Sequence, residues 1–241
     1  MAEGRGEEQG HLQRAPHVTG KMAPKGSASM IIRSLNIGLP KIENFHGKDI
    51  MTGMCKKPVA GPLLLTKLGF EGDGVGDRKH HGGEDKAVCV YSLDHFAYWR
   101  SVLGIEMPAA AFGENLSVEG LREGDVCIGD SFRIGTAVVQ VSQPRQPCGT
   151  LAARYGRNDL VKLVADSGKT GFYFRVLTEG QVRVGDPLAL TERDRLGVSI
   201  AFANNIFHHD RGNRDGIEKV LAVPALSLSW QRSFQELKNR L

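Results

Sequence analysis

Short apolar segments separated by glycine-containing turns run from Ile31 to Leu190, and they constrain the fold more than any other feature of this sequence. The segments are rich in β-branched residues, which favour strands. The chain has 30 glycines in 241 residues, about twice the usual frequency. Closely spaced short strands close into a barrel more readily than they form a doubly wound sheet. We therefore predict a mainly β, α+β fold, a closed β-barrel with peripheral helices, and strands at 31–37, 63–68, 87–91, 114–118, 126–128, 131–134, 137–141, 172–177 and 188–190.

Helical periodicity interrupts the strands twice and then dominates the C-terminal segment. Phe96, Trp99 and Leu103 recur at helical spacing, and a second such stripe begins at Leu160. Beyond residue 190 the pattern predicts helices near 198–208, 216–222 and 228–240. We therefore divide the chain into a disordered N-terminal extension (1–29), a β-barrel domain (30–190) and a three-helix C-terminal domain (191–241).

The net charge of +4 is spread thinly along the chain. Without a basic stripe, we expect no binding to duplex nucleic acid, and no apolar run is long enough for a membrane span. The N-terminal extension lacks the apolar region of a secretory signal, and its acidic residues disfavour a transit peptide, although its basic residues keep organellar targeting as an alternative. Four cysteines without paired spacing indicate a reducing compartment. We expect a cytoplasmic location.

Cys148 is the candidate reactive residue. It lies on a proline-stiffened loop after an apolar strand pattern, three residues beyond Arg145. This placement favours a thiolate and a soft-metal ligand, whereas structural cysteines are usually buried. Cys89 and Cys127 lie inside apolar strand runs and are predicted to pack as small hydrophobic side chains. Cys55 lies in a predicted loop beside lysines, and we do not expect it to belong to the functional site.

A glycine-rich loop carries the basic and imidazole side chains of residues 78–81 and then runs into a predicted strand. It either binds a phosphate or another anion, or is a solvated surface loop. His80 and His81 are adjacent and point to opposite faces of an extended segment, so a two-histidine metal site is not expected. Asn115, after a glycine at a strand start, either bonds a heterocycle edge or holds a turn.

Taken together, these segments resemble the MOSC family, named for the C-terminal domain of molybdenum cofactor sulfurase, and its YiiM-like branch in particular. The resemblance covers the chain from about residue 31 to the C-terminus. Each motif is weak alone, and their order along the chain makes the set specific. The matches are Leu-Gly-Phe-Glu-Gly-Asp at 68–73, His-Gly-Gly at 81–83, Phe-Gly-Glu-Asn-Leu at 112–116, Val-Ser-Gln-Pro-Arg-x-Pro-Cys at 141–148 and Gly-Lys-Thr-Gly-Phe-Tyr at 168–173.

The resemblance implies a MOSC-type closed β-barrel that binds the molybdenum cofactor (molybdenum with molybdopterin). It makes Cys148 both the catalytic residue and the protein thiolate on the metal. A guanidinium near this sulfur would favour the thiolate and an anionic cofactor. The residues that the resemblance implies for cofactor binding are Lys79, His81, Gly82, Gly83, Asn115, Ser142 and Arg145.

Relatives in this family are similar to reductases that convert hydroxylaminopurines, amidoximes and other N-hydroxylated compounds to amines. The sequence has no flavin fingerprint and no iron–sulfur spacing, so we expect a separate flavin or iron–sulfur reductase as electron donor. Two alternatives stay open: a sulfur carrier or transferase using a Cys148 persulfide, and a non-catalytic carrier of the cofactor. Pyridoxal phosphate belongs to a desulfurase domain attached in the sulfurases, for which we expect no room in 241 residues. A homodimer also stays open.

Overall fold

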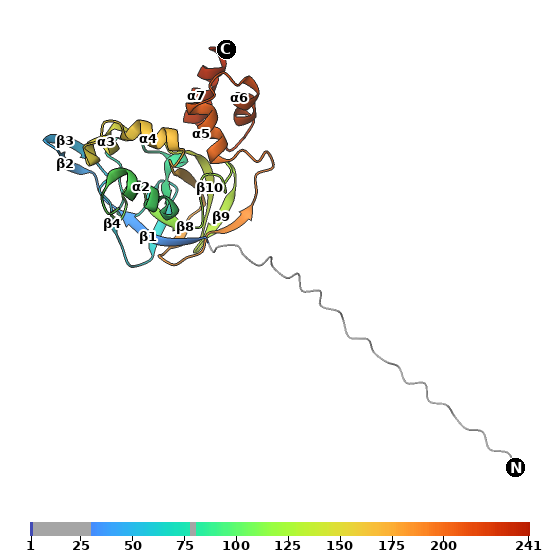
Figure 1. The fold of residues 1–241 in the computed structure, drawn as a ribbon. Coiled ribbons are helices and arrows are strands. Elements are labelled where there is room, and N and C mark those ends of the chain that lie inside the picture. Colours follow the sequence, from blue (N-terminus) through green and yellow to red (C-terminus); the bar gives the residue numbers. More distant parts are fainter. Residues whose placement is uncertain (2–29, 78–80) are drawn as a thin grey trace.

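The computed structural model describes Met1, residues 30–77 and residues 81–241, and its main element is a curled sheet of eight strands (Figure 1). The N-terminal extension beyond Met1 and the loop residues 78–80 lie outside the described residues. The strand order is β13-β9-β10-β11-β7-β8-β1-β4. The strands are β1 (Ile31–Ile37), β4 (Lys57–Pro58), β7 (Val88–Ser92), β8 (Leu116–Glu119), β9 (Ser131–Ile134), β10 (Ala137–Pro144), β11 (Phe172–Thr178) and β13 (Ala189–Glu192).

Strand β1 closes part of the sheet into a barrel. On one side it pairs with β8, and on the other its first residues meet the segment just before β13. The Ile32 N–H donates to the Asp186 carbonyl at 3.1 Å, and the Gly185 N–H donates to the Ile32 carbonyl at 2.9 Å. The two ends of the sheet therefore share backbone hydrogen bonds, which leaves fewer unpaired edge groups. The predicted α+β barrel fold with a C-terminal helical unit is confirmed.

The central strands bring three distant segments to one end of the barrel. Tyr173 on β11 stands between Gln143 on β10 and Cys89 on β7 in the antiparallel register. Strand β10 ends at Pro144, and the chain continues through a loop into the next helix. Below this end, alternate side chains from the strands fill the core, including Phe132, Phe172 and Phe174.

In the described part of the chain, two small sheets and three helices cover the barrel. Strand β5 pairs with β6 and β12, while β2 and β3 form a hairpin at the edge of the molecule (Figure 1). The helices pack over a second apolar cluster that contains Tyr91, Trp99 and Phe112. These elements are β2 (Lys41–Phe45), β3 (Lys48–Thr52), β5 (Leu63–Thr66), β6 (Gly69–Phe70), β12 (Gly180–Val182), α2 (Phe96–Leu103), α3 (Gly149–Tyr155) and α4 (Leu160–Ser167), with 3-10 turns at Glu84–Lys86 and Leu93–His95.

Three C-terminal helices form a unit that stands beside one end of the barrel (Figure 1). They are α5 (Ile200–His208), α6 (Arg214–Leu221) and α7 (Leu228–Lys238). They begin after the capping residues Ser199, Asn213 and Ser227 respectively, and each capping side chain accepts the backbone N–H of the residue three positions later. Buried Trp230 and Phe234 belong to the same continuous core as the barrel residues. The predicted helices are confirmed, whereas the division of the chain at residue 190 stays a prediction.

Most of the predicted strands are present, with ends shifted by a few residues. The predicted strand at 126–128 is wrong, because this segment forms only an isolated bridge from Cys127 to Ser199. Its backbone bonds the start of the helical unit instead: the Ile128 N–H donates to the Val198 carbonyl at 2.9 Å. The β2–β3 hairpin and α3 were not anticipated from the sequence. Among the described helices, none has both the length and the apolar content required to traverse a bilayer.

Candidate functional site

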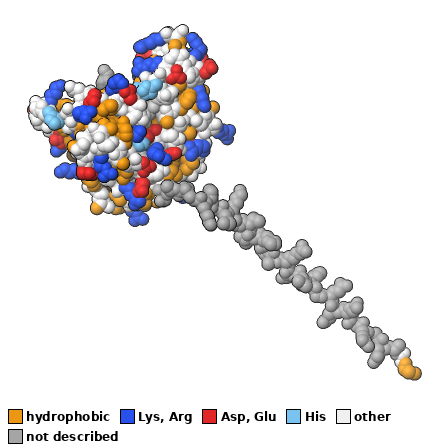
Figure 2. All heavy atoms as spheres, viewed as in Figure 1, with side chains coloured by type: hydrophobic (Ala, Val, Ile, Leu, Met, Phe, Trp, Pro, Cys, Tyr) orange, Lys and Arg blue, Asp and Glu red, His pale blue; other side chains and the backbone are white. Residues whose placement is uncertain are grey.

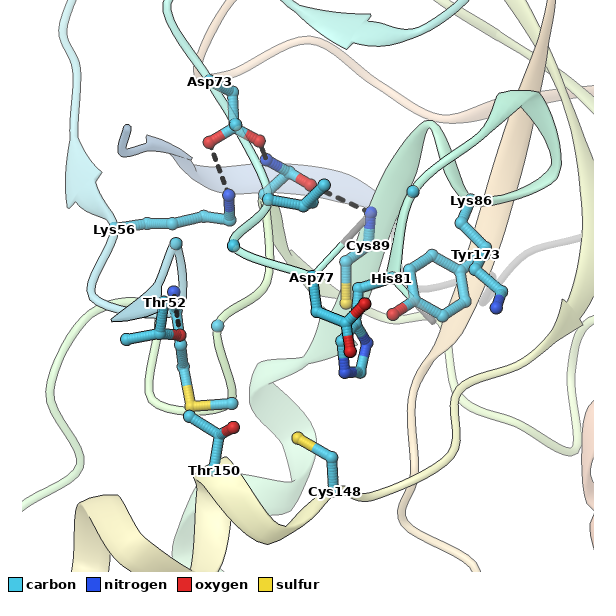
Figure 3. A pocket seen from close by; sticks show the side chains of 18 of the residues that line it. Thr52, Lys56, Asp73, Asp77, His81, Lys86, Cys89, Cys148, Thr150 and Tyr173 are labelled. Carbon is cyan, nitrogen blue, oxygen red and sulfur yellow. Dashed lines mark hydrogen bonds and ion pairs between the residues drawn. The ribbon is translucent and has the colours of Figure 1, made fainter. Parts of the chain in front are cut away.

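A cavity of about 460 Å³ opens at the end of the barrel where β7, β10 and β11 bring their loops together. Its lining includes six of the residues singled out from the sequence: His81, Gly82, Gly83, Asn115, Arg145 and Cys148. Figure 3 shows the side chains of Cys89, His81, Cys148 and Tyr173 around one shared space. Lys79 lies outside the described residues. The candidate residues that meet here come from segments far apart in the sequence.

Cys148 sits directly before α3, at the end of the loop that follows β10. Burial raises the pKa of its thiol, but a hydrogen bond from His81, the charge of Arg145 and the Leu151 backbone N–H lower the pKa to about 6. The side chain is only partly exposed, and it lines the cavity. Near neutral pH this residue is therefore a thiolate, the form of cysteine that acts as nucleophile and metal ligand.

Arg145 places a buried positive charge in the cavity wall. Arg145 is 4% exposed, and its Nη2 donates to the Phe112 carbonyl at 2.8 Å. Among the described residues, the Nη1 atom has no hydrogen-bond partner, and no carboxylate forms an ion pair with this guanidinium. A buried charged donor without a partner is costly, so the site is built to receive an anionic or hydrogen-bond-accepting group.

Asn115 is held by the protein itself. Its Oδ1 accepts the Cys89 backbone N–H at 3.0 Å, and its Nδ2 donates to Asp73 at 2.7 Å and to the Asn36 carbonyl at 3.2 Å. All of its amide groups are therefore used within the fold. This arrangement favours the structural reading of Asn115 over recognition of a heterocycle edge.

Lys56 and Asp73 form a buried ion pair on the cavity wall that sequence reasoning missed. The Asp73 carboxylate also accepts the Gly38 N–H at 2.9 Å and the Asn115 amide. In the sequence, Lys56 is only one of the loop lysines beside Cys55. Asp73 lies inside the Leu-Gly-Phe-Glu-Gly-Asp motif, which was the available signal. The two charges neutralise each other, so the pair fixes part of the wall of the cavity that Arg145 also lines without adding net charge.

Cys89 is buried, as predicted, but it also lines the cavity. Burial raises the pKa of its thiol to about 11 despite the nearby charge of Arg145. Burial likewise raises the pKa of Tyr173, whose hydroxyl hydrogen-bonds the Cys89 sulfur. Cys89 and Tyr173 therefore stay protonated where Cys148 is ionised.

Ser142 lies behind the cavity wall and is not among the lining residues. It is fully buried, and its hydroxyl donates to the Asp85 carbonyl at 2.5 Å. The Tyr173 carbonyl lies 3.2 Å from the same hydroxyl oxygen. This serine supports the loop that carries His81 and does not face the space a ligand would fill. Cys55 is also outside the lining, and burial raises the pKa of its thiol. Cys55 thus differs from Cys148 in both position and ionisation.

Two glycines of the lining are required by geometry. Gly83 has φ +97° at the start of the 3-10 turn, a conformation that side chains rarely adopt. Gly113 has φ +76°, and a Cβ atom there would meet the Met54 side chain at 2.9 Å. Both glycines allow the backbone to pass close to the cavity.

Comparison with known proteins agrees with this architecture. A MOSC domain model matches residues 77–189, and a YiiM-like 3-alpha helix domain model matches residues 198–239. The protein YflK of Bacillus subtilis is 50% identical over 87% of this chain and 95% of its own length. The crystal structure of YiiM from Geobacillus stearothermophilus is 44% identical, with a TM-score of 0.75, over 87% of this chain and 99% of that chain. The chain belongs to the MOSC family, in its YiiM-like branch with a C-terminal helical domain.

A fungal protein is similar over part of its length. A protein of Gibberella moniliformis named "Reductase" is 32% identical over 76% of this chain, and the match covers 31% of that protein. MOSC domains as a family are associated with the molybdenum cofactor.

Proposed function

We propose that this protein binds the molybdenum cofactor through Cys148 and reduces N-hydroxylated compounds to amines. The observation that carries the proposal is the combination of a thiolate at Cys148 with an unpartnered Arg145 Nη1 in one cavity. A thiolate is a preferred ligand for a soft metal. A buried guanidinium donor suits an anionic cofactor group.

The residues present fit such a group on three grounds. Cys148 supplies the sulfur ligand, Arg145 supplies buried positive charge, and His81 donates a hydrogen bond to the sulfur. The glycines at 82 and 83 leave the wall beside His81 without side chains. Ser142 is better assigned to supporting the loop than to contacting the cofactor.

When bound, the cofactor supplies a two-electron redox centre that the protein side chains lack. The overall reaction is R-NHOH + 2 e⁻ + 2 H⁺ → R-NH2 + H2O, in which the N–O bond breaks and nitrogen is reduced. The chain must therefore hold the substrate in the cavity and provide two protons. Lys86 lines the cavity, and burial lowers the pKa of its ammonium group, which makes it a better proton donor near neutral pH.

The two electrons need an external source, and we propose a separate flavin or iron–sulfur reductase as partner. The sequence has neither a dinucleotide fingerprint nor a cluster-type cysteine spacing. In support of redox chemistry, one relative carries the name reductase. We also propose a cytoplasmic location, because all four cysteines are free thiols.

A sulfur-carrier function is the second candidate, and the low pKa of Cys148 favours it. A partly exposed thiolate can attack the outer sulfur of a donor persulfide, so that the S–S bond of the donor breaks, the donor leaves as a thiolate and Cys148 becomes the persulfide. Turnover separates the candidates. Protein expressed in a cofactor-competent host should convert a hydroxylaminopurine or an amidoxime to the amine, anaerobically and with an artificial donor, and Cys148→Ser should not. Bound molybdenum without turnover would indicate a cofactor carrier and contradict the reductase proposal.

A further inference from the structure

The cavity loop and the C-terminal helical unit meet at one carboxylate. Asp85 lies in the 3-10 turn two residues after Gly83, so it anchors the end of the loop that carries His81. Its Oδ1 accepts two hydrogen bonds from Arg175 of β11, at 3.0 and 2.6 Å. Its Oδ2 accepts the backbone N–H of Leu228, the first residue of α7, at 3.2 Å.

The same region of α7 also holds the strand that leads to Cys148. The Ser227 N–H donates to the Ser142 carbonyl at 3.0 Å, and the Ser142 hydroxyl donates to the Asp85 carbonyl at 2.5 Å. The Ser229 hydroxyl donates to the Gln143 side chain at 2.9 Å. The start of α7 is therefore bonded both to the 3-10 turn after the His81 loop and to β10, whose following loop ends at Cys148.

We propose that Asp85 is a positioning residue, through which the N-terminal end of α7 holds the His81–Gly83 loop against Cys148. The helical unit is then a part of the site, although none of its residues lines the cavity. Gly82 and Gly83 allow the loop many conformations, so an external anchor is needed to hold His81 within reach of the sulfur. The inference rests on the proposed use of the Cys148 thiolate.

The charges that surround these groups give the test a clear sign. His81 and Arg145 face Cys148, while Arg175 and Lys86 face Asp85. Removing the negative charge of Asp85 by itself would lower the thiol pKa, because fewer anions would oppose the thiolate. Loss of the His81 hydrogen bond would raise it. A rise therefore reports displacement of the loop.

The readout is the pH dependence of Cys148 alkylation by iodoacetamide, in a Cys55→Ser background without cofactor. The parent should show an inflection near 6, as the pKa of Cys148 indicates. Asp85→Ala should move the inflection upward by about one unit. An unchanged or lowered inflection in folded Asp85→Ala protein would overturn the proposal.

Leu228 offers a matched pair that tests the helix separately. Proline is tolerated at the first position of a helix, and Ser227 before it has φ −59° and ψ 149°, a conformation that a following proline permits. Leu228→Pro removes the N–H that bonds Asp85, whereas Leu228→Ala removes only an exposed side chain. We expect a raised inflection for Leu228→Pro and the parent value for Leu228→Ala. Equal inflections in the two Leu228 variants would show that α7 does not position the loop. This comparison remains valid even if Asp85→Ala fails to fold. Because no metal is involved, these results stand apart from molybdenum binding.

Discussion

His81 hydrogen-bonds the Cys148 sulfur, so the loop that precedes β7 and the loop that follows β10 meet in one contact. The contact stabilises a thiolate in a partly buried place where burial alone would keep the thiol protonated. Arg145, in the wall of the same cavity, adds positive charge. The ionisation of Cys148 is therefore a property of the folded site and of no single segment.

Arg145 should control this ionisation. Replacing it by methionine removes the charge that helps to lower the pKa of Cys148, so the pKa of the thiol should rise from about 6 toward its ordinary value. The alkylation rate as a function of pH measures the change. Arg154→Met is a suitable control, since Arg154 is not in the cavity lining. An unchanged inflection in Arg145→Met would contradict the role given to Arg145.

Stability should depend on pH through Cys148. A thiol whose pKa is lowered by folding from 9.0 to about 6 contributes stability that is complete above pH 9 and is lost as the pH falls through about 6. The stability advantage of the parent over Cys148→Ser should therefore shrink from pH 9 to pH 6. Urea unfolding at several pH values measures this difference. A difference that stays constant or grows toward low pH would contradict the lowered pKa.

Asp73 should be important for stability. Asp73→Ala leaves the buried Lys56 ammonium without its carboxylate and frees the Asn115 amide. Breaking a buried pair in this way costs about 3–5 kcal/mol. The double variant Asp73→Ala, Lys56→Met should recover part of the loss. Urea unfolding checks both, and a loss under about 1 kcal/mol in the single variant would show that the pair is not needed.

Trp230 tests whether the helical unit shares its core with the barrel. Trp230 is 1% exposed and contacts Phe207 and Phe234 within the common core. Trp230→Ala should cost about 3–5 kcal/mol and lower the temperature of one common unfolding transition. Calorimetry would reveal two separate transitions if the unit were independent of the barrel.

The surface of the protein carries mixed charge, as the thin spread of net charge along the sequence predicts. On the face shown in Figure 2, Lys and Arg side chains are interspersed with Asp and Glu side chains. The thin spread of net charge along the chain already indicated such a mixture. The space-filling view also shows the helical unit as a projection from the barrel (Figure 2).

Local patterns predicted the strands and helices well where they carried periodicity or caps. Ser227 before the apolar stripe of α7 is an example, because a capping side chain and a helical repeat are both readable in one sequence. The sequence did not predict the β2–β3 hairpin, because its mostly polar, exposed residues give little alternation of apolar and polar side chains. The sequence does not reveal the short α3, because this helix begins without a capping side chain directly after the proline-containing loop that carries Cys148.

The cavity could be predicted only in part. Cys148 and Arg145 were readable because they share one motif, and His81 because it shares a glycine-rich loop. Lys56 was missed because its partner Asp73 lies on a different segment, and pairing between separate loops is not encoded locally. Ser142 was assigned to the cofactor, yet its buried hydroxyl bonds the loop backbone. Contacts between distant segments decide such roles.

Molybdenum content in three proteins tests the central claim most directly. The parent, Cys148→Ser and Cys55→Ser should be expressed in a cofactor-competent host, purified and analysed for metal. We predict about one molybdenum per chain in the parent and in Cys55→Ser, and none in Cys148→Ser. Equal molybdenum in all three proteins, or none in the parent, would contradict the assignment of Cys148 as the metal ligand.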